Sequence, residues 1–306
     1  MEKDREEEIN IPIIRNLVSY SKRIKLPGLG RFSLYHLLDI YGTGIIKGSF
    51  SPRASSIAYS FLLALFPFLL LLLNLIPYIP IEGFQTRFLI FVEALLPAQT
   101  TQFFYPIIAD IAVNPRAGLL SFVFFLSVVL SANGVNAIFS AFEYSFHVSI
   151  NRSFFRQYMV AVAVSMFVAA LFLASVGVIL YGEYVIYDLQ SRAYLTNDVF
   201  YILLFQFLVF VFMIYTVIAT LYYFGTKEGK TSKFFSVGAG VTTVLFILTT
   251  YFFGVYINNF SNYNELYGSI GALLILMLYI WINSNLLLLG FELNISIQRL
   301  KEKIEH

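Results

Sequence analysis

Long apolar stretches alternate with short polar segments along the whole chain. Six of them lie at about 57–76, 119–142, 157–181, 199–223, 235–257 and 269–292. A helix needs about 20 apolar residues to cross a hydrocarbon layer about 30 Å thick, and each stretch meets that requirement. The pattern therefore predicts an all-α protein, a polytopic bundle of six transmembrane helices.

The polar segments predict three parts: an N-terminal segment (1–50), a transmembrane domain (51–294) and a tail (295–306). The stretch 31–48 is apolar but carries His36, Asp39 and Lys47, which indicates an amphipathic helix on the inner membrane surface. A soluble cytoplasmic helix is the alternative. The segment 77–118 mixes prolines and charges with short apolar runs, so we expect a long outer loop containing short helices.

Composition supports the same class of protein. Hydrophobic residues make up 58% of the chain and charged residues only 12%, against about 25% charged in a soluble domain. The chain contains no cysteine, which excludes disulfides and cysteine-ligated zinc. The acidic N-terminus, with Glu6, Glu7 and Glu8, lacks the apolar run of a cleaved signal peptide.

The distribution of Lys and Arg predicts the orientation. Seventeen of the 20 lie before the first stretch or after the second, fourth and sixth. Only Arg87, Arg116 and Arg192 lie on the other side. Because cytoplasmic loops carry the excess of positive charge, both termini are expected in the cytoplasm.

Deep polar residues concentrate in the second and sixth stretches. A spacing of three, four and three residues places four of them on one helical face of the second stretch. They either line a hydrophilic cavity and bind substrate, or join helices by hydrogen bonds worth about 0.6–2 kcal/mol each. The substrate-pathway candidates are Asn133, Asn136, Ser140, Glu143, Gln206, Asn283, Asn285 and Glu292.

Two further features have a functional and a structural interpretation. Glu143 and Glu292 fall near the cytoplasmic ends of their helices, where each either carries a proton or simply contacts water or an arginine. Pro67 predicts a kink in the first span. Close helix packing is expected at six glycines: Gly134, Gly238, Gly240, Gly268, Gly271 and Gly290.

No enzyme motif is evident. The three histidines, at positions 36, 147 and 306, form no HExxH pattern, and neither a GxSxG elbow nor a phosphate-binding GxxxxGK[ST] loop occurs. We therefore expect no catalytic residue, no metal and no cofactor.

Four short motifs lie in order over about residues 50–297. The first span contains 57–67, which ends in Ala64-Leu65-Phe66-Pro67. Leu96-Pro97 follows in the outer loop, and a Ser- and Asn-bearing helix lies at 131–144. The closing motif combines Tyr267-Gly268-Ser269, Trp281 and Leu289-Gly290-Phe291-Glu292. Together these motifs resemble those of the YihY/BrkB family of inner-membrane proteins. Two departures are Ala64, where the family usually has Ser, and Phe224-Gly225, where a Pro is expected.

The resemblance implies a multi-pass protein of the bacterial inner membrane. The family has been labelled both virulence factor and ribonuclease BN; this sequence, without a metal-binding constellation or a basic RNA-binding face, does not fit the second label. The leading hypothesis is a transporter or exporter of a small solute or lipid, and the alternative is a membrane scaffold. A membrane ribonuclease is the least favoured.

If the substrate is a lipid, a groove open to the bilayer is expected, with Arg53, Arg152 and Arg156 as head-group candidates at its cytoplasmic mouth. The expected partners are membrane lipids and an unidentified solute or lipid, with no nucleic acid. Self-association into a homo-oligomer is left open.

Overall fold

In the structure, a computed structural model, the described residues form six long helices. It describes residues 50–75, 117–144, 153–191, 198–226, 234–259 and 269–305, with a few single residues elsewhere. Most of the predicted interfacial helix at 31–48 and most of the predicted outer loop at 77–118 lie outside the described residues. The helices are α3 (Phe50–Leu75), α6 (Ala117–Glu143), α7 (Phe154–Ser191), α8 (Asp198–Gly225), α9 (Val237–Asn259) and α11 (Ser269–Glu305).

These helices confirm the predicted all-α membrane bundle, since each predicted stretch falls largely within one of them. Among the described residues, five helices are long and apolar enough to cross a membrane: α6, α7, α8, α9 and α11. Helix α3 is not among the five. The chain is thus a multi-pass membrane protein, and a sixth crossing stays a prediction.

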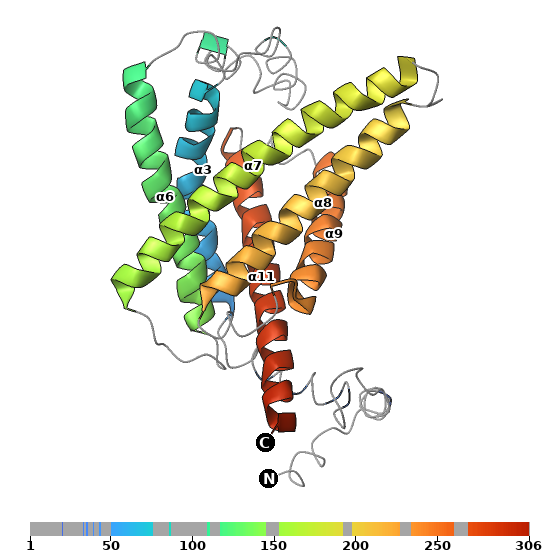
Figure 1. The fold of residues 1–306 in the computed structure, drawn as a ribbon. Coiled ribbons are helices and arrows are strands. Elements are labelled where there is room, and N and C mark those ends of the chain that lie inside the picture. Colours follow the sequence, from blue (N-terminus) through green and yellow to red (C-terminus); the bar gives the residue numbers. More distant parts are fainter. Residues whose placement is uncertain are drawn as a thin grey trace.

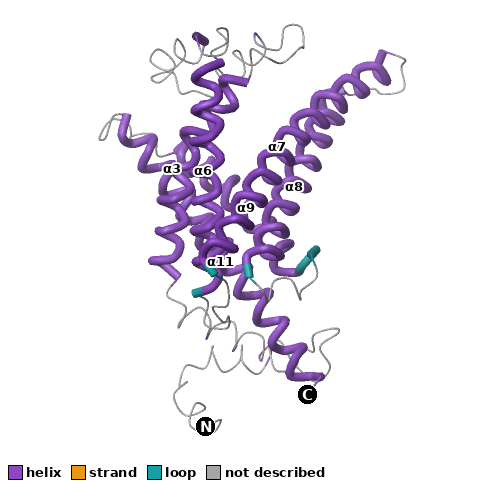
Figure 2. Tube along the Cα trace, turned by 60° about the vertical axis from the view of Figure 1, so that its left-hand side comes forward, coloured by secondary structure: helices purple, strands orange, loops and turns teal. Residues whose placement is uncertain are grey.

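Helices α3 and α6 form one group and helices α7 and α8 form another, and the two groups meet toward one end of the bundle. Figure 1 shows α3 beside α6, and α7 beside α8 as an antiparallel pair that runs obliquely across the bundle. In Figure 2 the α7–α8 pair leans away from α3 and α6 toward the end where α7 finishes and α8 begins. Helix α11 packs against both α3 and α9.

The buried core lies toward the end of the bundle where α3 begins and α6 finishes. It contains Ala54 of α3, Phe142 of α6, Tyr222 of α8 and Phe291 of α11. The ring of Phe142 stacks on that of Phe291 with centroids 4.0 Å apart, and Tyr222 meets both rings edge-on at 5.7 and 5.8 Å. The stacked rings hold three helices together at this end.

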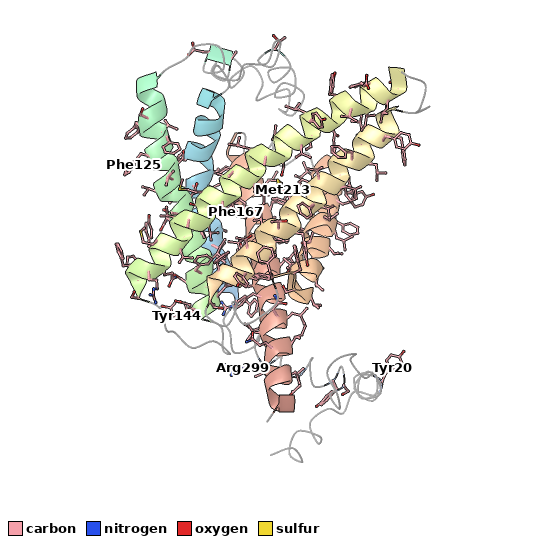
Figure 3. The ribbon with its side chains drawn as sticks, viewed as in Figure 1. Tyr20, Phe125, Tyr144, Phe167, Met213 and Arg299 are labelled. Carbon is pink, nitrogen blue, oxygen red and sulfur yellow. The ribbon has the colours of Figure 1, made fainter. Side chains whose placement is uncertain are left out.

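Large apolar side chains elsewhere point outward. Phe125 of α6 is 70% exposed and Phe167 of α7 is 46% exposed (Figure 3). In water such surfaces would be unfavourable, whereas in a bilayer they face acyl chains. Tyr181, Tyr184 and Tyr187 of α7 are also exposed, as is usual for tyrosines at a membrane–water boundary.

Helices α7 and α11 run farther than their apolar stretches. Helix α7 continues from the predicted end at 181 to Ser191, and α11 continues from 292 to Glu305. Apolarity reports only the part of a helix that lies in hydrocarbon, and a helix need not stop where the chain leaves the lipid. The predicted tail therefore begins inside a helix.

Helices α9 and α11 approach closely at Gly238 and Gly290. A Cβ on Gly238 would lie 2.5 Å from Oδ1 of Asn294 and would also overlap the carbonyl oxygen of Gly290. A Cβ on Gly290 would overlap Oγ1 of Thr242. The predicted packing role of these two glycines is confirmed, because no side chain fits between the helices here.

The other predicted packing glycines are less constrained. A Cβ on Gly134 would find its nearest atom at 3.7 Å, and one on Gly240 at 3.9 Å, both ordinary contacts. Gly271 is buried in α11, and Gly268 lies outside the described residues. Alanine would therefore fit at 134 and 240.

Hydrogen bonds reinforce the junction of α8, α9 and α11. The Tyr222 hydroxyl donates to the carbonyl of Leu287 at 2.7 Å and lies 2.8 Å from Oγ1 of Thr242. Oδ1 of Asn294 accepts from the backbone N–H of Gly238 at 2.7 Å. That N–H belongs to the first turn of α9 and has no partner within its own helix, so α11 caps α9.

Candidate functional site

A polar joint connects α6 and α7 through Gln157. Nε2 of Gln157 lies 3.0 and 3.3 Å from the carboxylate oxygens of Glu143 when the amide is oriented to donate to them. In that orientation its oxygen accepts from Oγ of Ser140 at 3.1 Å and lies 3.2 Å from Oδ1 of Asn136. The orientation is chemically favoured because a carboxylate only accepts. Three of the four residues predicted to share a face of α6 therefore meet at one amide.

Gln157 was not among the sequence candidates, although it is only 5% exposed. It lies in the first turns of α7, a position that the apolar pattern assigns to the helix boundary. Its contacts with Ser140 and Glu143 correspond to the interhelical hydrogen-bond interpretation of the α6 polar face. Asn133 is half-buried on α6, and Gln206 is half-buried on α8.

Three polar residues in the middle of α11, Asn283, Ser284 and Asn285, bond to their own helix. Nδ2 of Asn283 donates to the carbonyl of Tyr279 at 2.9 Å, and Oγ of Ser284 donates to that of Ile280 at 2.8 Å. Nδ2 of Asn285 does the same at 2.8 Å four residues back. Serine and asparagine side chains readily form such bonds inside helices. A bond to the residue's own helix is neither the substrate contact nor the interhelical hydrogen bond that were considered from the sequence.

A buried hydroxyl joins α6 to α3 at the proline. Oγ of Ser127 donates to the carbonyl of Pro67 at 2.6 Å. Helix α3 continues from Phe50 to Leu75 through Pro67, and the predicted kink stays a prediction.

A groove of about 510 Å³ lies along α7 and α8 near the start of α7. Arg156 is the charged residue of its lining, and the other lining residues are almost all apolar. Met159 and Phe167 in its wall are about half exposed, which places the groove at the lateral surface of the bundle. The lining residues are Arg156, Met159, Val160, Ala163, Val164, Phe167, Thr220, Phe224 and Phe234.

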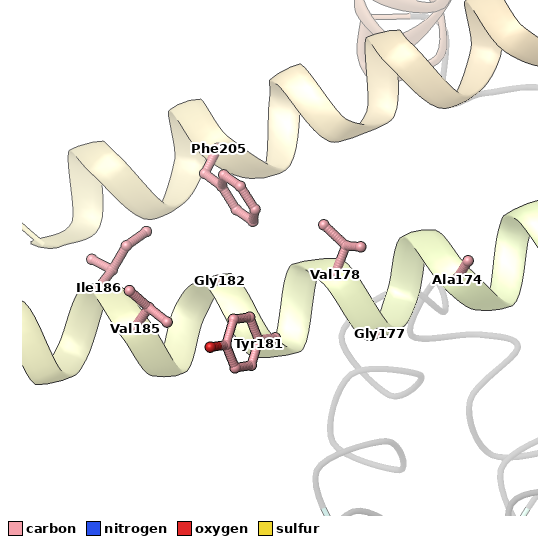
Figure 4. A pocket seen from close by; sticks show the side chains of 8 residues that line it. All are labelled: Ala174, Gly177, Val178, Tyr181, Gly182, Val185, Ile186 and Phe205. Carbon is pink, nitrogen blue, oxygen red and sulfur yellow. The ribbon is translucent and has the colours of Figure 1, made fainter.

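A second hollow, of about 600 Å³, lies farther along the same two helices. Figure 4 shows Phe205 of α8 pointing toward α7 opposite Gly182. A Cβ on Gly182 would overlap the Phe205 ring, so a larger residue at 182 would displace that ring. The lining residues are Ala174, Gly177, Val178, Tyr181, Gly182, Val185, Ile186 and Phe205.

The two hollows share one face of α7. Arg156, Val160 and Ala163 in the groove are each followed 18 residues later by a lining residue of the second hollow. Eighteen residues are five turns of an α-helix, so the paired residues point in the same direction. We call this face of α7, with the facing residues of α8, the α7–α8 seam. From 156 to 186 it extends about 45 Å, about the thickness of a bilayer with its head groups.

The seam is suited to an apolar, elongated ligand with a negative charge at one end. Of the three predicted head-group candidates, Arg156 lines the groove and Arg152 lies outside the described residues. Arg53 is not part of the seam: it lies buried in the first turn of α3. Neither hollow is lined by α6 or α11, the helices with most of the predicted substrate contacts.

The seam, the α6–α7 joint and the glycine contact all lie within a region that matches one known family. Residues 45–306 match the family model of virulence factor BrkB. The chain belongs to this family. The match covers all six described helices, and it agrees with the resemblance found in the first-span and closing motifs.

Relatives of this BrkB-family chain include both proteins named for the membrane and one named for an enzyme. The ribonuclease-like protein YfkH of Bacillus subtilis is 27% identical over 252 residues, 82% of this chain and 90% of YfkH. A UPF0761 membrane protein of Coxiella burnetii is 25% identical over 245 residues, 78% of this chain and 84% of the relative. No solved structure matches the chain.

The described part of this BrkB-family chain contains no group of three or more His, Asp or Glu side chains placed to hold a metal ion. Of the three histidines, none lies in the described residues.

Proposed function

We propose that this BrkB-family protein is a lipid transporter or exporter. It holds the acyl chains of an anionic phospholipid in the α7–α8 seam and places the phosphate beside Arg156. The observation that carries the proposal is the seam itself, whose described lining is apolar along its length and carries Arg156 at one end.

The seam favours a lipid over a polar solute as the substrate. A polar solute loses its hydration in a pathway and needs hydrogen-bonding groups to replace it. Besides Arg156, the described lining offers the hydroxyls of Thr220 and Tyr181, and that of Thr220 already donates to its own helix at 2.7 Å. Acyl chains need no such groups, and their transfer to an apolar groove costs little in a bilayer.

Arg156 gives the seam its preference for negative charge. A guanidinium binds two phosphate oxygens at once, which supports recognition of a phosphodiester. A basic residue near a membrane surface contributes about 1 kcal/mol to binding of an anionic lipid, about a fivefold change in affinity. The proposal places Arg156 on the cytoplasmic side of the bacterial inner membrane, with both termini in the cytoplasm, and assigns the chain no catalytic group or cofactor.

Transbilayer movement of lipid tests the proposal. The purified chain is reconstituted into phosphatidylcholine vesicles that contain a trace of fluorescent phosphatidylglycerol, and the inward-facing fraction is followed by quenching from outside. Ala163→Trp fills the groove and should reduce the movement at least tenfold. Met166→Trp is the matched control, because Met166 lies on α7, is 53% exposed and does not line the groove.

Arg156→Gln should weaken binding of phosphatidylglycerol about fivefold and leave binding of phosphatidylcholine unchanged. Equal lipid movement with Ala163→Trp and Met166→Trp would remove the seam from the pathway. A wild-type chain that neither binds nor moves lipid would overturn the proposal and favour the scaffold. Cleavage of single-stranded RNA by the purified chain with Mg²⁺ would instead favour the ribonuclease alternative.

A further inference from the structure

The guanidinium of Arg53 is buried without a hydrogen-bond partner. Arg53 lies in the first turn of α3 and is only 7% exposed. Within the described part of the chain, none of its three nitrogens, Nε, Nη1 and Nη2, has a hydrogen-bond acceptor. Its guanidinium carbon lies 4.8 Å from the centroid of the Phe50 ring, a cation–π contact that leaves all five N–H groups unused.

Glu292 balances the charge of Arg53 but does not satisfy its donors. Glu292 lies on α11, is fully buried and acts electrostatically on Arg53 across the contact between α3 and α11. No hydrogen bond from Arg53 reaches it. A buried guanidinium with unmet donors is unfavourable, and it is relieved only by an acceptor. The pair therefore leaves a requirement for an additional acceptor beside Arg53.

A second unused donor lies one turn farther along α11. Ser296 follows Glu292 by four residues and so lies on the same face of the helix. It is fully buried, and its hydroxyl has no hydrogen-bond partner among the described residues. Buried polar groups are nearly always paired, so this hydroxyl, one helical turn from Glu292, is a second donor that a ligand of Arg53 could satisfy.

The beginning of α3 adds positive potential at the same place. The first N–H groups of a helix have no partner in the helix, and the N-terminal end carries a partial positive charge. The first turn of α3 contains no acidic residue to offset it and carries Arg53 instead. Helix N-termini bind phosphate and carboxylate groups for this reason.

We propose that the junction of α3 and α11 binds a singly charged oxyanion of the phosphate type. Arg53 donates to two of its oxygens, and Ser296 donates to a third. Glu292 keeps the net charge of the site low, which favours one negative charge over two. The site is separate from the α7–α8 seam, and its ligand is either free phosphate or the phosphodiester of a lipid head group.

Thermal unfolding of the purified chain tests the site. In one arm, in neutral detergent, sodium phosphate at pH 6 is compared with sodium chloride at equal ionic strength. In the other, nanodiscs containing phosphatidylglycerol are compared with nanodiscs of phosphatidylcholine. Whichever source fills the site should raise the unfolding temperature of the wild type by roughly 5 °C at a hundredfold excess over Kd.

The variants connect the response to the site. Arg53→Lys keeps the charge but loses the paired donors, and should lose most of the shift, whereas Arg299→Lys on the exposed side of α11 should keep it. Ser296→Ala should reduce the shift. Its control, Ser284→Ala, should keep it, because the Ser284 hydroxyl donates to its own helix.

The two arms identify the source of the phosphate. If Arg53→Lys does not fold, Ser296→Ala alone decides whether the response depends on this site. Equal shifts in the wild type, Arg53→Lys and Ser296→Ala would overturn the proposal, as would the absence of a shift in both arms. Ala163→Trp, which fills the seam, should leave the shift unchanged, so the oxyanion site and the lipid pathway can fail independently.

Discussion

Replacing Gly290 by alanine tests the close approach of α9 and α11. The new methyl group would overlap Oγ1 of Thr242, lie 2.5 Å from the Tyr222 hydroxyl and lie 3.0 Å from the carbonyl oxygen of Gly238. Two of these neighbours are fixed by hydrogen bonds, and the third is backbone, so the helices must separate. The same change alters the hydrophobic surface very little.

The expected loss of stability follows from three terms. Alanine gains about 1 kcal/mol over glycine as a helix former. Overpacking costs about 1–3 kcal/mol, and losing the bonds of Tyr222 and Thr242 costs about 1 kcal/mol each. The variant should therefore be about 2–4 kcal/mol less stable, which lowers the unfolding temperature by roughly 4–16 °C.

Gly134→Ala is the matched control, since Gly134 is also buried in a helix but a Cβ there has no neighbour closer than 3.7 Å. It should unfold at the wild-type temperature or slightly above, because only the helix-propensity term remains. Thermal unfolding of both variants in the same detergent makes the comparison. If Gly290→Ala is as stable as Gly134→Ala, the close approach is refuted. Adding Thr242→Ala to Gly290→Ala should restore part of the loss, because it removes the nearest overlapping atom.

Two further predictions concern the joint of α3 with α6 and the crossing by α6. Ser127→Ala removes the bond to the Pro67 carbonyl and should lower the free energy of unfolding by about 0.6–1.7 kcal/mol, measured by thermal unfolding. Ser55→Ala, at an exposed site of α3, is the control and should lower it less. Equal losses of stability in the two variants would contradict the joint. Because the chain contains no cysteine, single cysteines at Tyr144 and Gly118 report the two ends of α6. A membrane-impermeant maleimide should label Gly118→Cys in intact cells and Tyr144→Cys only in inverted vesicles, and labelling of both from one side would show that α6 does not cross.

The sequence predicts the helices well because lipid constrains them so strongly. Backbone groups in hydrocarbon must bond within the segment, so an apolar run of sufficient length has few alternatives to a helix. The stretch at 119–142 accordingly becomes α6, Ala117–Glu143. The end of a helix can be predicted only where the helix stops at the boundary of the lipid. Helix α7 does not stop there, since it continues ten residues past its apolar stretch to Ser191.

The site is less predictable because it depends on how helices pair. The regular spacing of Asn136, Ser140 and Glu143 indicates a shared face, but nothing in that spacing identifies Gln157 as the residue that meets them. Asn283 and Asn285 are polar residues of the kind that line a transport pathway, but their side-chain donors bond to their own helix. The seam is apolar, so along the sequence it cannot be distinguished from any other lipid-facing surface.

The oblique course of α7 and α8 has a consequence for the surrounding bilayer. The seam is about 45 Å long, and Figure 1 shows that the two helices forming it run obliquely to α3 and α6. Its two ends therefore meet different parts of the surrounding lipid, one beside the core and the other away from it. A molecule that followed the seam would leave the opposite leaflet at a site remote from where it entered.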